Sequence, residues 1–150
     1  MKKNLITTLI LTLFSWNMNG SNSDLDFFVS AAKLFAKENK NKEVGRMDDM
    51  YLNQDNNIVM VTSVTNQITK ENQQSFEKKI NEPQHKQQAI LIMKKNMPKF
   101  AWKYLVKLVH KHQTNFIVLY KDTQSGLNAQ ILLPPDLFTI QLKIFIHHFI

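Results

Sequence analysis

Acid–base chemistry in this chain could draw on the aspartates Asp48, Asp49, Asp122 and Asp136. Asp122 is the most suggestive, because it closes an apolar run of strand type and open α/β sheets place their sites at the carboxyl ends of strands. No base or nucleophile lies near it in sequence, and Ser125 lacks the glycine on its other side that a nucleophile elbow requires. We therefore predict that the protein is not an enzyme.

The histidines are poorly spaced for a shared metal ion. His110 and His112 are two residues apart and would point about 200° away from each other on a helix, while His147 and His148 would face opposite sides of a strand. A zinc site would need a distant partner such as His85. The chain also has no cysteine, which removes thiolate ligands and thiol redox chemistry, and its three glycines cannot form a phosphate-binding loop. We expect no metal and no other cofactor.

The chain is basic, with a formal net charge of +7. Of its 19 Lys and Arg residues, 18 are lysine and only Arg46 is arginine, so the bidentate fork that recognises phosphates and bases is nearly absent. Lys99, Trp102 and Lys103 share part of one helix face, where a base could stack between cations. A lysine-rich module that binds nucleic acid or an anionic surface is therefore an alternative hypothesis. The simpler interpretation packs Trp102 at a helix–sheet boundary among solvated lysines.

Residues 1–23 have the order of a secretion signal. The second and third residues are lysine, residues 5–14 form an uncharged, mostly apolar run, and Ser21 and Ser23 place small residues at positions −3 and −1 of a cleavage after Ser23. The apolar run is too short to span a bilayer core of about 30 Å. We predict export to the periplasm with cleavage. Retention as an N-terminal anchor, with membrane contact through the uncleaved signal alone, is the alternative.

An amphipathic helix is predicted directly after the signal, from about Leu25 to Asn39. Ser23 and Asp26 have the spacing of a capping box, and apolar residues then recur at helical intervals, including Phe28 and Phe35. Such a stripe packs on the domain's own core or binds a partner. Residues 40–57 are polar and predict a loop, residues 58–64 predict a strand, and residues 65–79 predict a mobile helix or hairpin.

The most regular pattern predicts a βαβ unit between residues 89 and 120. The apolar run at 89–93 has the length of a strand, Pro98 is placed to open a helix that continues to His112, and residues 116–120 form a second apolar strand. Two buried strands around one helix favour a parallel pair with a right-handed crossover. A strand is also expected at 129–133. From Phe138 to His147 apolar and other residues alternate, which predicts a half-buried strand at the end of an incomplete domain.

This order resembles the TrbC family, the pilin-assembly proteins of F-type conjugative transfer systems. The resemblance lies in AILIMKKNMP at 89–98, the helix through His112, FIVLY at 116–120 and ILLPPDLF at 131–138. The cysteines common in relatives, and the longer helix that follows their second strand, are missing here.

The resemblance implies a thioredoxin-like α/β domain without redox activity that assists assembly of a conjugative pilus and type IV secretion channel. Its partners would be other envelope or transfer-system proteins, with no small-molecule substrate. The expected organisation is a signal peptide at 1–23, a helical, polar region at 24–88 and the α/β domain at 89–150. The expected interaction surface comprises Phe28, Phe35, Lys99, Trp102 and Lys103.

Overall fold

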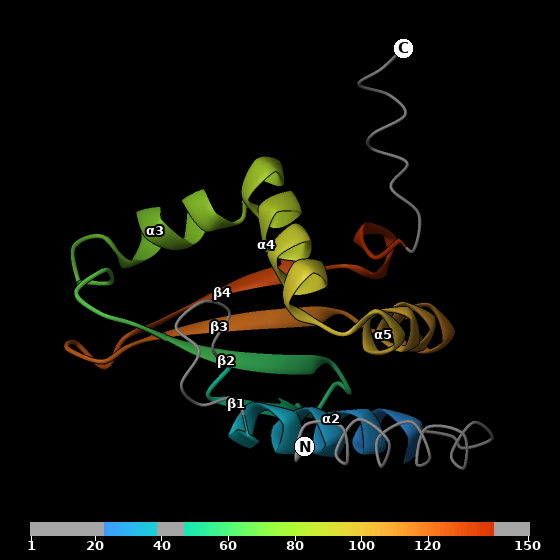
Figure 1. Ribbon diagram of the computed structural model, residues 1–150. Coiled ribbons are helices and arrows are strands. Elements are labelled where there is room, and N and C mark those ends of the chain that lie inside the picture. The colour runs from blue at the N-terminus through green and yellow to red at the C-terminus, as the bar shows by residue number, and fades with distance from the viewer. Residues whose placement is uncertain (1–22, 39–46, 140–150) are drawn as a thin grey trace.

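The computed structural model describes residues 23–38 and 47–139 as a mixed α/β fold around one four-stranded sheet (Figure 1). In chain order the elements are α2 (Ser23–Glu38), β1 (Asp49–Leu52), β2 (Ile58–Val64), α3 (Gln73–Ile80), α4 (Pro83–Asn96), α5 (Lys99–His112), β3 (Phe116–Asp122), β4 (Asn128–Leu133) and the 3-10 turn η1 (Pro135–Leu137). The predicted α/β class is confirmed.

The sheet consists of a parallel pair between two antiparallel strands. β2 and β3 run parallel, with Ile58 opposite Phe116 and Val64 opposite Asp122, and the chain between them passes through α3, α4 and α5. β1 pairs with β2 and β4 pairs with β3, both antiparallel, so the strand order in the sheet follows the sequence. Parallel neighbours need such a long crossover because the chain must return from the C-terminal end of one strand to the N-terminal end of the next, on the opposite side of the sheet.

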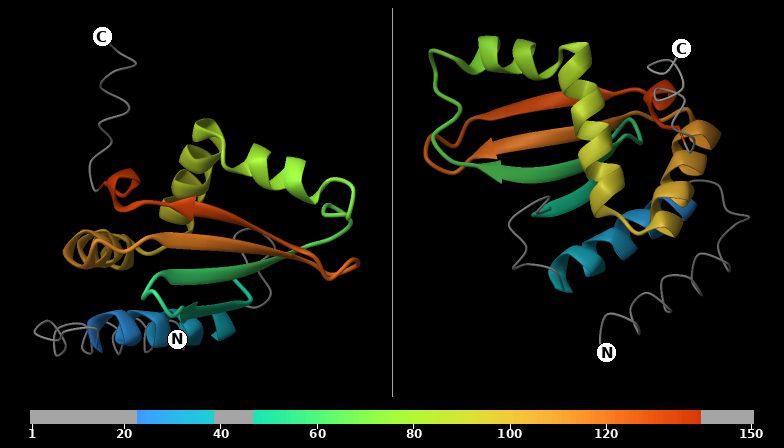
Figure 2. Two further views of the ribbon diagram at one scale, coloured as in Figure 1. Left: turned by 180° about the vertical axis from the view of Figure 1, so that it is seen from behind. Right: turned by 45° about the horizontal axis from the view of Figure 1, so that its top comes forward.

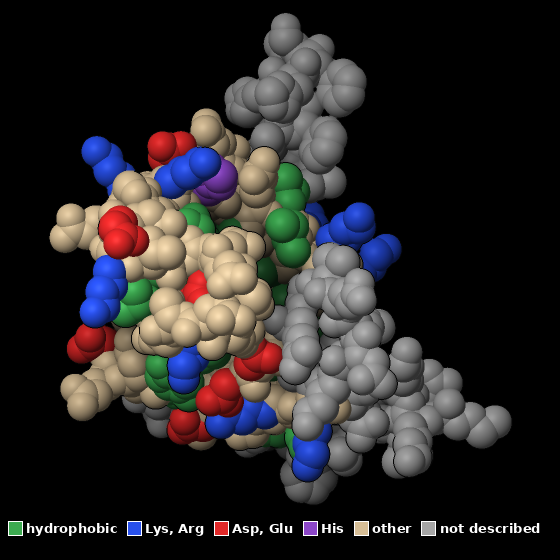
Figure 3. Space-filling model, turned by 90° about the vertical axis from the view of Figure 1, so that its left-hand side faces the viewer, with side chains coloured by type: hydrophobic (Ala, Val, Ile, Leu, Met, Phe, Trp, Pro, Cys, Tyr) green, Lys and Arg blue, Asp and Glu red, His purple; other side chains and the backbone are tan. Residues whose placement is uncertain are grey.

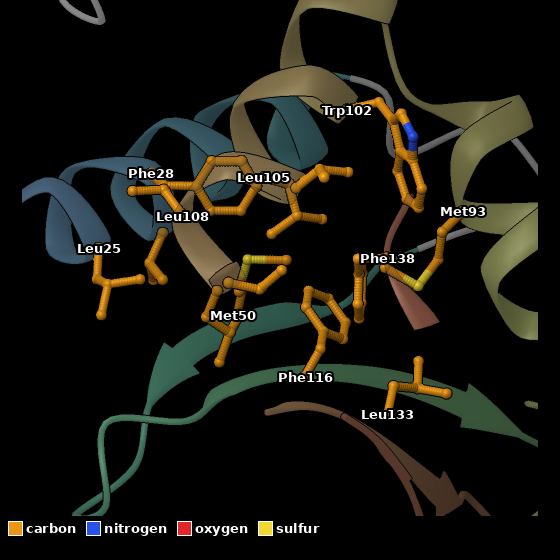
Figure 4. Close-up of a cluster of buried hydrophobic side chains, with 14 of the residues drawn as sticks. Leu25, Phe28, Met50, Met93, Trp102, Leu105, Leu108, Phe116, Leu133 and Phe138 are labelled. Carbon is orange, nitrogen blue, oxygen red and sulfur yellow. The ribbon is translucent and has the colours of Figure 1, made fainter. Parts of the chain in front are cut away.

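One face of the sheet and the helices enclose the hydrophobic core (Figures 2 and 4). Side chains alternate between the two faces of a strand, and the register places Met50, Met60, Val118 and Ile131 side by side on the helix face. Buried residues from every layer complete the cluster, among them Leu25, Phe28, Met93, Trp102, Leu105, Leu108, Phe116, Leu133 and Phe138.

Helix α5 is the central helix of this core, as its sequence period predicts. Trp102, Leu105 and Val109 are buried on one side, while Lys103 and Lys107 are exposed on the other. Pro98, which cannot continue a helix from α4, precedes the first residue of α5. Gln113 ends α5 in the left-handed conformation, with a φ of 49°.

The prediction of a strand at 89–93 is wrong, because these residues lie inside helix α4. Burial within the run has a helical period: Ile90 and Met93 face the core, whereas Leu91 and Ile92 are exposed. The first strand of the parallel pair is instead β2, and the crossover contains three helices in place of one.

The other predicted elements agree with the structure in part. The strands predicted at 58–64, 116–120 and 129–133 are confirmed as β2, β3 and β4. The stretch 40–57, expected as a loop, contains β1, and a helix within 65–79 is present as α3.

The division expected at residue 88 falls inside α4, and the sheet takes strands from both sides of it. Of the signal sequence predicted at 1–23, residues 1–22 lie outside the described residues and Ser23 begins α2; the predicted C-terminal strand beyond Thr139 also lies outside them.

Candidate interaction surfaces and buried carboxylates

Asp122, the strongest acid–base candidate in the sequence, is a buried structural carboxylate. Its Oδ2 accepts the N–H groups of Gln67 at 2.7 Å and Ile68 at 2.8 Å, and its Oδ1 accepts those of Gln124 at 2.8 Å and Ser125 at 3.0 Å. These bonds, led by those from Ile68 and Ser125, hold the pKa of Asp122 far below its ordinary value against the opposing effect of burial. With both oxygens occupied, Asp122 joins the loop after β2 to the β3–β4 turn.

Asp24 is a second buried carboxylate, and its partners fix α2 against the end of α5. Its Oδ2 accepts a hydrogen bond from Lys111 Nζ at 2.8 Å, and its Oδ1 lies 2.8 Å from His112 Nε2. Burial would raise the pKa of Asp24, but the bonds from Lys111 and His112 lower it below the ordinary value. Burial, and then the charge of Asp24, raises the pKa of the neighbouring Tyr104. Sequence reasoning missed this cluster because its members lie almost ninety residues apart.

The remaining chemical candidates are dispersed. Asp48 bonds to the Ser63 hydroxyl, and Asp49 pairs with Lys33 of α2 at 3.5 Å on the surface. His110 Nε2 lies 2.7 Å from the carbonyl oxygen of Phe138. Among residues 23–38 and 47–139, no three His, Asp or Glu side chains come together as a metal site would require.

The interaction surface expected from the sequence needs correction at Phe28 and Trp102, because both are buried in the core. Phe28 packs on Tyr104 with ring centroids 6.2 Å apart, and Trp102 stacks on Phe138 at 5.7 Å. The Trp102 indole N–H donates to the Thr139 carbonyl oxygen at 3.3 Å. Neither ring is available to a partner or to a stacked base.

The other three members of the expected surface do not form one site. Lys99 and Lys103 are exposed on α5, without the aromatic platform between them. Phe35 belongs to α2, but its side chain lies outside the described residues. Figure 3 shows lysine and acidic side chains interspersed over much of the described part of one face, which differs from the continuous basic stripe of a nucleic-acid site.

The second face of the sheet, the one opposite the helices, is a more coherent apolar surface. By register it carries Tyr51, Val59, Val61, Ile117, Leu119 and Leu132, and none of these belongs to the core cluster. Val59 and Ile117 in the two central strands are buried, whereas Tyr51 and Leu132 in the outer strands are 37% and 40% exposed. No described helix lies against this face when the molecule is seen from behind (Figure 2).

The outer edge of β4 is covered by polar side chains of α3 and its C-cap. Gln73 Nε2 donates to the Asn128 carbonyl at 2.8 Å, and the Glu77 carboxylate accepts the Gln130 N–H at 3.0 Å. Asn81 donates to the Gln130 carbonyl at 2.9 Å and accepts the Leu132 N–H at 3.2 Å. The sequence signal was available: these three polar residues recur at intervals of four, which places them on one side of a helix. The spacing alone does not show that this side of the helix meets the edge of β4.

Comparisons with known proteins identify no relative: no family model, no curated protein and no solved structure matches the chain. Within the described part of the chain, no helix is both long enough and apolar enough to cross a membrane.

Proposed function

We propose that the protein is a non-enzymatic assembly component that acts by contact with other proteins, and that the second face of its sheet is the contact surface. The observation that carries this proposal is the set of apolar residues on that face outside the core, with Tyr51 and Leu132 still exposed. An apolar surface of this kind is stabilised when a partner removes it from water. The occupant we propose is a mainly apolar surface of another envelope protein.

The finer form of the proposal rests on the resemblance to TrbC. In this form the protein is periplasmic, has a thioredoxin-like arrangement and assists assembly of a conjugative pilus and type IV secretion channel. Two structural facts agree with action by contact. Asp122 and Asp24 are occupied by structural hydrogen bonds, and Tyr51 and Leu132 of the second face are exposed.

Complementation of a deletion strain that carries the transfer system tests the proposal. Deletion should lower conjugative transfer without changing growth, and the wild-type gene should restore transfer. Leu132→Lys should restore little of it, because a charge on the second face opposes burial against an apolar partner. Leu91→Lys is the matched control: Leu91 is similarly exposed, at 47%, but lies on α4 away from that face.

Thermal unfolding of both purified variants must show that they remain folded. Full transfer with a folded Leu132→Lys protein would remove the second face as the contact surface. Unchanged transfer in the deletion strain would remove the role in conjugation altogether.

A further inference from the structure

We propose that the outer edge of β4 is a self-pairing site, and that α3 covers it until a second copy of this chain replaces the helix. The two copies would join β4 to β4 in an antiparallel ladder and form one continuous sheet. This inference goes beyond the proposed contact function and does not depend on it, since it uses the backbone groups at the edge of β4 and not the side chains of the second face.

The hydrogen-bonding groups that α3 covers are those that such a ladder requires. Asn128 O, Gln130 N, Gln130 O and Leu132 N point away from β3 and bond to α3 side chains or to Asn81. In an antiparallel pair with a two-fold axis at Gln130, the N–H and carbonyl of each Gln130 would bond to those of the other copy. Each Leu132 N–H would meet the other copy's Asn128 carbonyl. The edge is therefore complementary to itself in the register that uses all of these groups.

Asn81 occupies two of these groups at once. Its side-chain amide donates to the Gln130 carbonyl and accepts the Leu132 N–H, and in the antiparallel ladder these two groups would bond to Gln130 and Asn128 of the second copy. An uncovered strand edge recruits other chains, and covering it with a helix is one way that proteins prevent this.

Helix α3 is attached to the edge of β4 more weakly than the strands of the sheet are attached to one another. Helix α3 has no fully buried residue, and its apolar contacts come from Ile80, half-buried against the core, and Phe76, which meets Tyr120 edge-on at 6.4 Å. By contrast, the loop before it is firmly held, because Ile68 is buried and its N–H bonds to Asp122. The helix can therefore leave the edge while the loop at its N-terminal side stays in place.

Hydrogen exchange measured by NMR on the wild-type protein tests the first step. The N–H groups of Gln130 and Leu132 should exchange together with those of α3, because opening of α3 alone exposes them. The alternate residues Ile131 and Leu133 face β3 and should exchange much more slowly. Equal exchange of both sets in β4 would contradict a separable cover.

Sedimentation analysis of the double variant Glu77→Ala/Asn81→Ala tests the pairing itself. Removal of three of the edge bonds should lower the dimer dissociation constant by roughly tenfold to a hundredfold relative to wild type, since the helix then competes less well for the edge. The matched control is Glu71→Ala/Gln74→Ala, which likewise removes one glutamate and one side-chain amide, but from exposed positions outside these contacts, and should sediment as wild type.

Adding Gln130→Pro to the double variant locates the interface. The Gln130 N–H points away from β3, so proline keeps the β3–β4 ladder and removes only the outward donor. The triple variant should return to a monomer. Dimers that survive this change would overturn pairing through β4, as would a double variant that stays monomeric at every concentration while Ile131 and Leu133 remain protected. If Ile131 and Leu133 lose their protection in the double variant, the single variant Asn81→Asp takes its place, because it replaces only the amide donor. Dimers that survive Gln130→Pro, or a monomer at every concentration, would overturn the proposal in that variant too.

Discussion

Two carboxylates, Asp24 and Asp122, are almost completely removed from water, and hydrogen-bond donors from neighbouring and from distant segments occupy their oxygens. An ionised carboxylate in such a place costs free energy unless it is paired and hydrogen-bonded. Asp122 meets this requirement with backbone N–H groups alone, whereas Asp24 uses the side chains of Lys111 and His112 beside the N–H of Leu25. Each therefore acts as a junction between segments: Asp122 between two loops, and Asp24 between two helices.

Replacement of Asp122 by asparagine should lower the stability of the protein at neutral pH. Asparagine has one side-chain oxygen and would leave part of the N–H set without an acceptor. Because the folded-state pKa of Asp122 is depressed, its stabilising contribution is fully present above the unfolded-state value of about 3.9 and is lost as the pH falls through the folded-state value. Urea unfolding of both proteins from neutral pH down to acid measures this. The difference between wild type and Asp122→Asn should shrink as the solution becomes acidic, and a constant difference would contradict the assignment.

At the scale of elements, the sequence period predicted α5, β2 and β3 but misassigned the run at 89–93. A short apolar run is compatible with a buried strand or a helix segment, and five residues are too few for periodicity to decide. The length of the whole segment distinguishes a helix from a strand here. The polar residues between Pro83 and Gln88 extend the apolar run into a fourteen-residue helix whose proline stands in the first turn. β1 escaped notice because its four residues include only one buried side chain, Met50.

The candidate site was less predictable than the elements that form it. The helical spacing of Phe28 and Trp102 fits a contact surface and a core face equally well. The packing of Phe28 on Tyr104 and of Trp102 on Phe138 shows that both belong to the core. The pairing of β4 with Asn81 and the meeting of Asp24 with His112 depend on tertiary placement, which no local pattern contains.

The core face of α5 gives a prediction at this scale. Leu105 is completely buried, so Leu105→Ala should reduce the free energy of unfolding by about 2–5 kcal/mol, through lost burial and a remaining cavity. Lys107→Ala, on the exposed side of the same helix, should change it by less than about 0.5 kcal/mol. Chemical denaturation measures both. A small effect at Leu105 would mean that α5 is not packed as described.

Over the whole molecule, the sheet has one face that the helices cover and a second face that no described helix covers (Figure 2). The helices cover the first face, and the cross-strand row from Tyr51 through Val59 and Ile117 to Leu132 lies on the second. The mixed sheet also leaves two outer strands, with β1 beside α2 and β4 beside α3 (Figure 1). Contact with other chains can thus use a sheet face or a sheet edge, which is why the two proposals concern separate surfaces.

The charge of the whole chain leads to a prediction about nucleic acid. The net charge of +7 arises almost entirely from lysine, and burial of Trp102 removes the aromatic group between Lys99 and Lys103. Binding to single-stranded DNA should therefore be weak and electrostatic, falling by orders of magnitude as salt rises from about 50 to 200 mM. Fluorescence anisotropy with a labelled oligonucleotide over this range measures the slope. Lys99→Ala/Lys103→Ala should reduce the slope modestly, because scattered lysines contribute additively. Tight binding that persists at about 0.15 M salt would instead favour a nucleic-acid-binding protein over an assembly component.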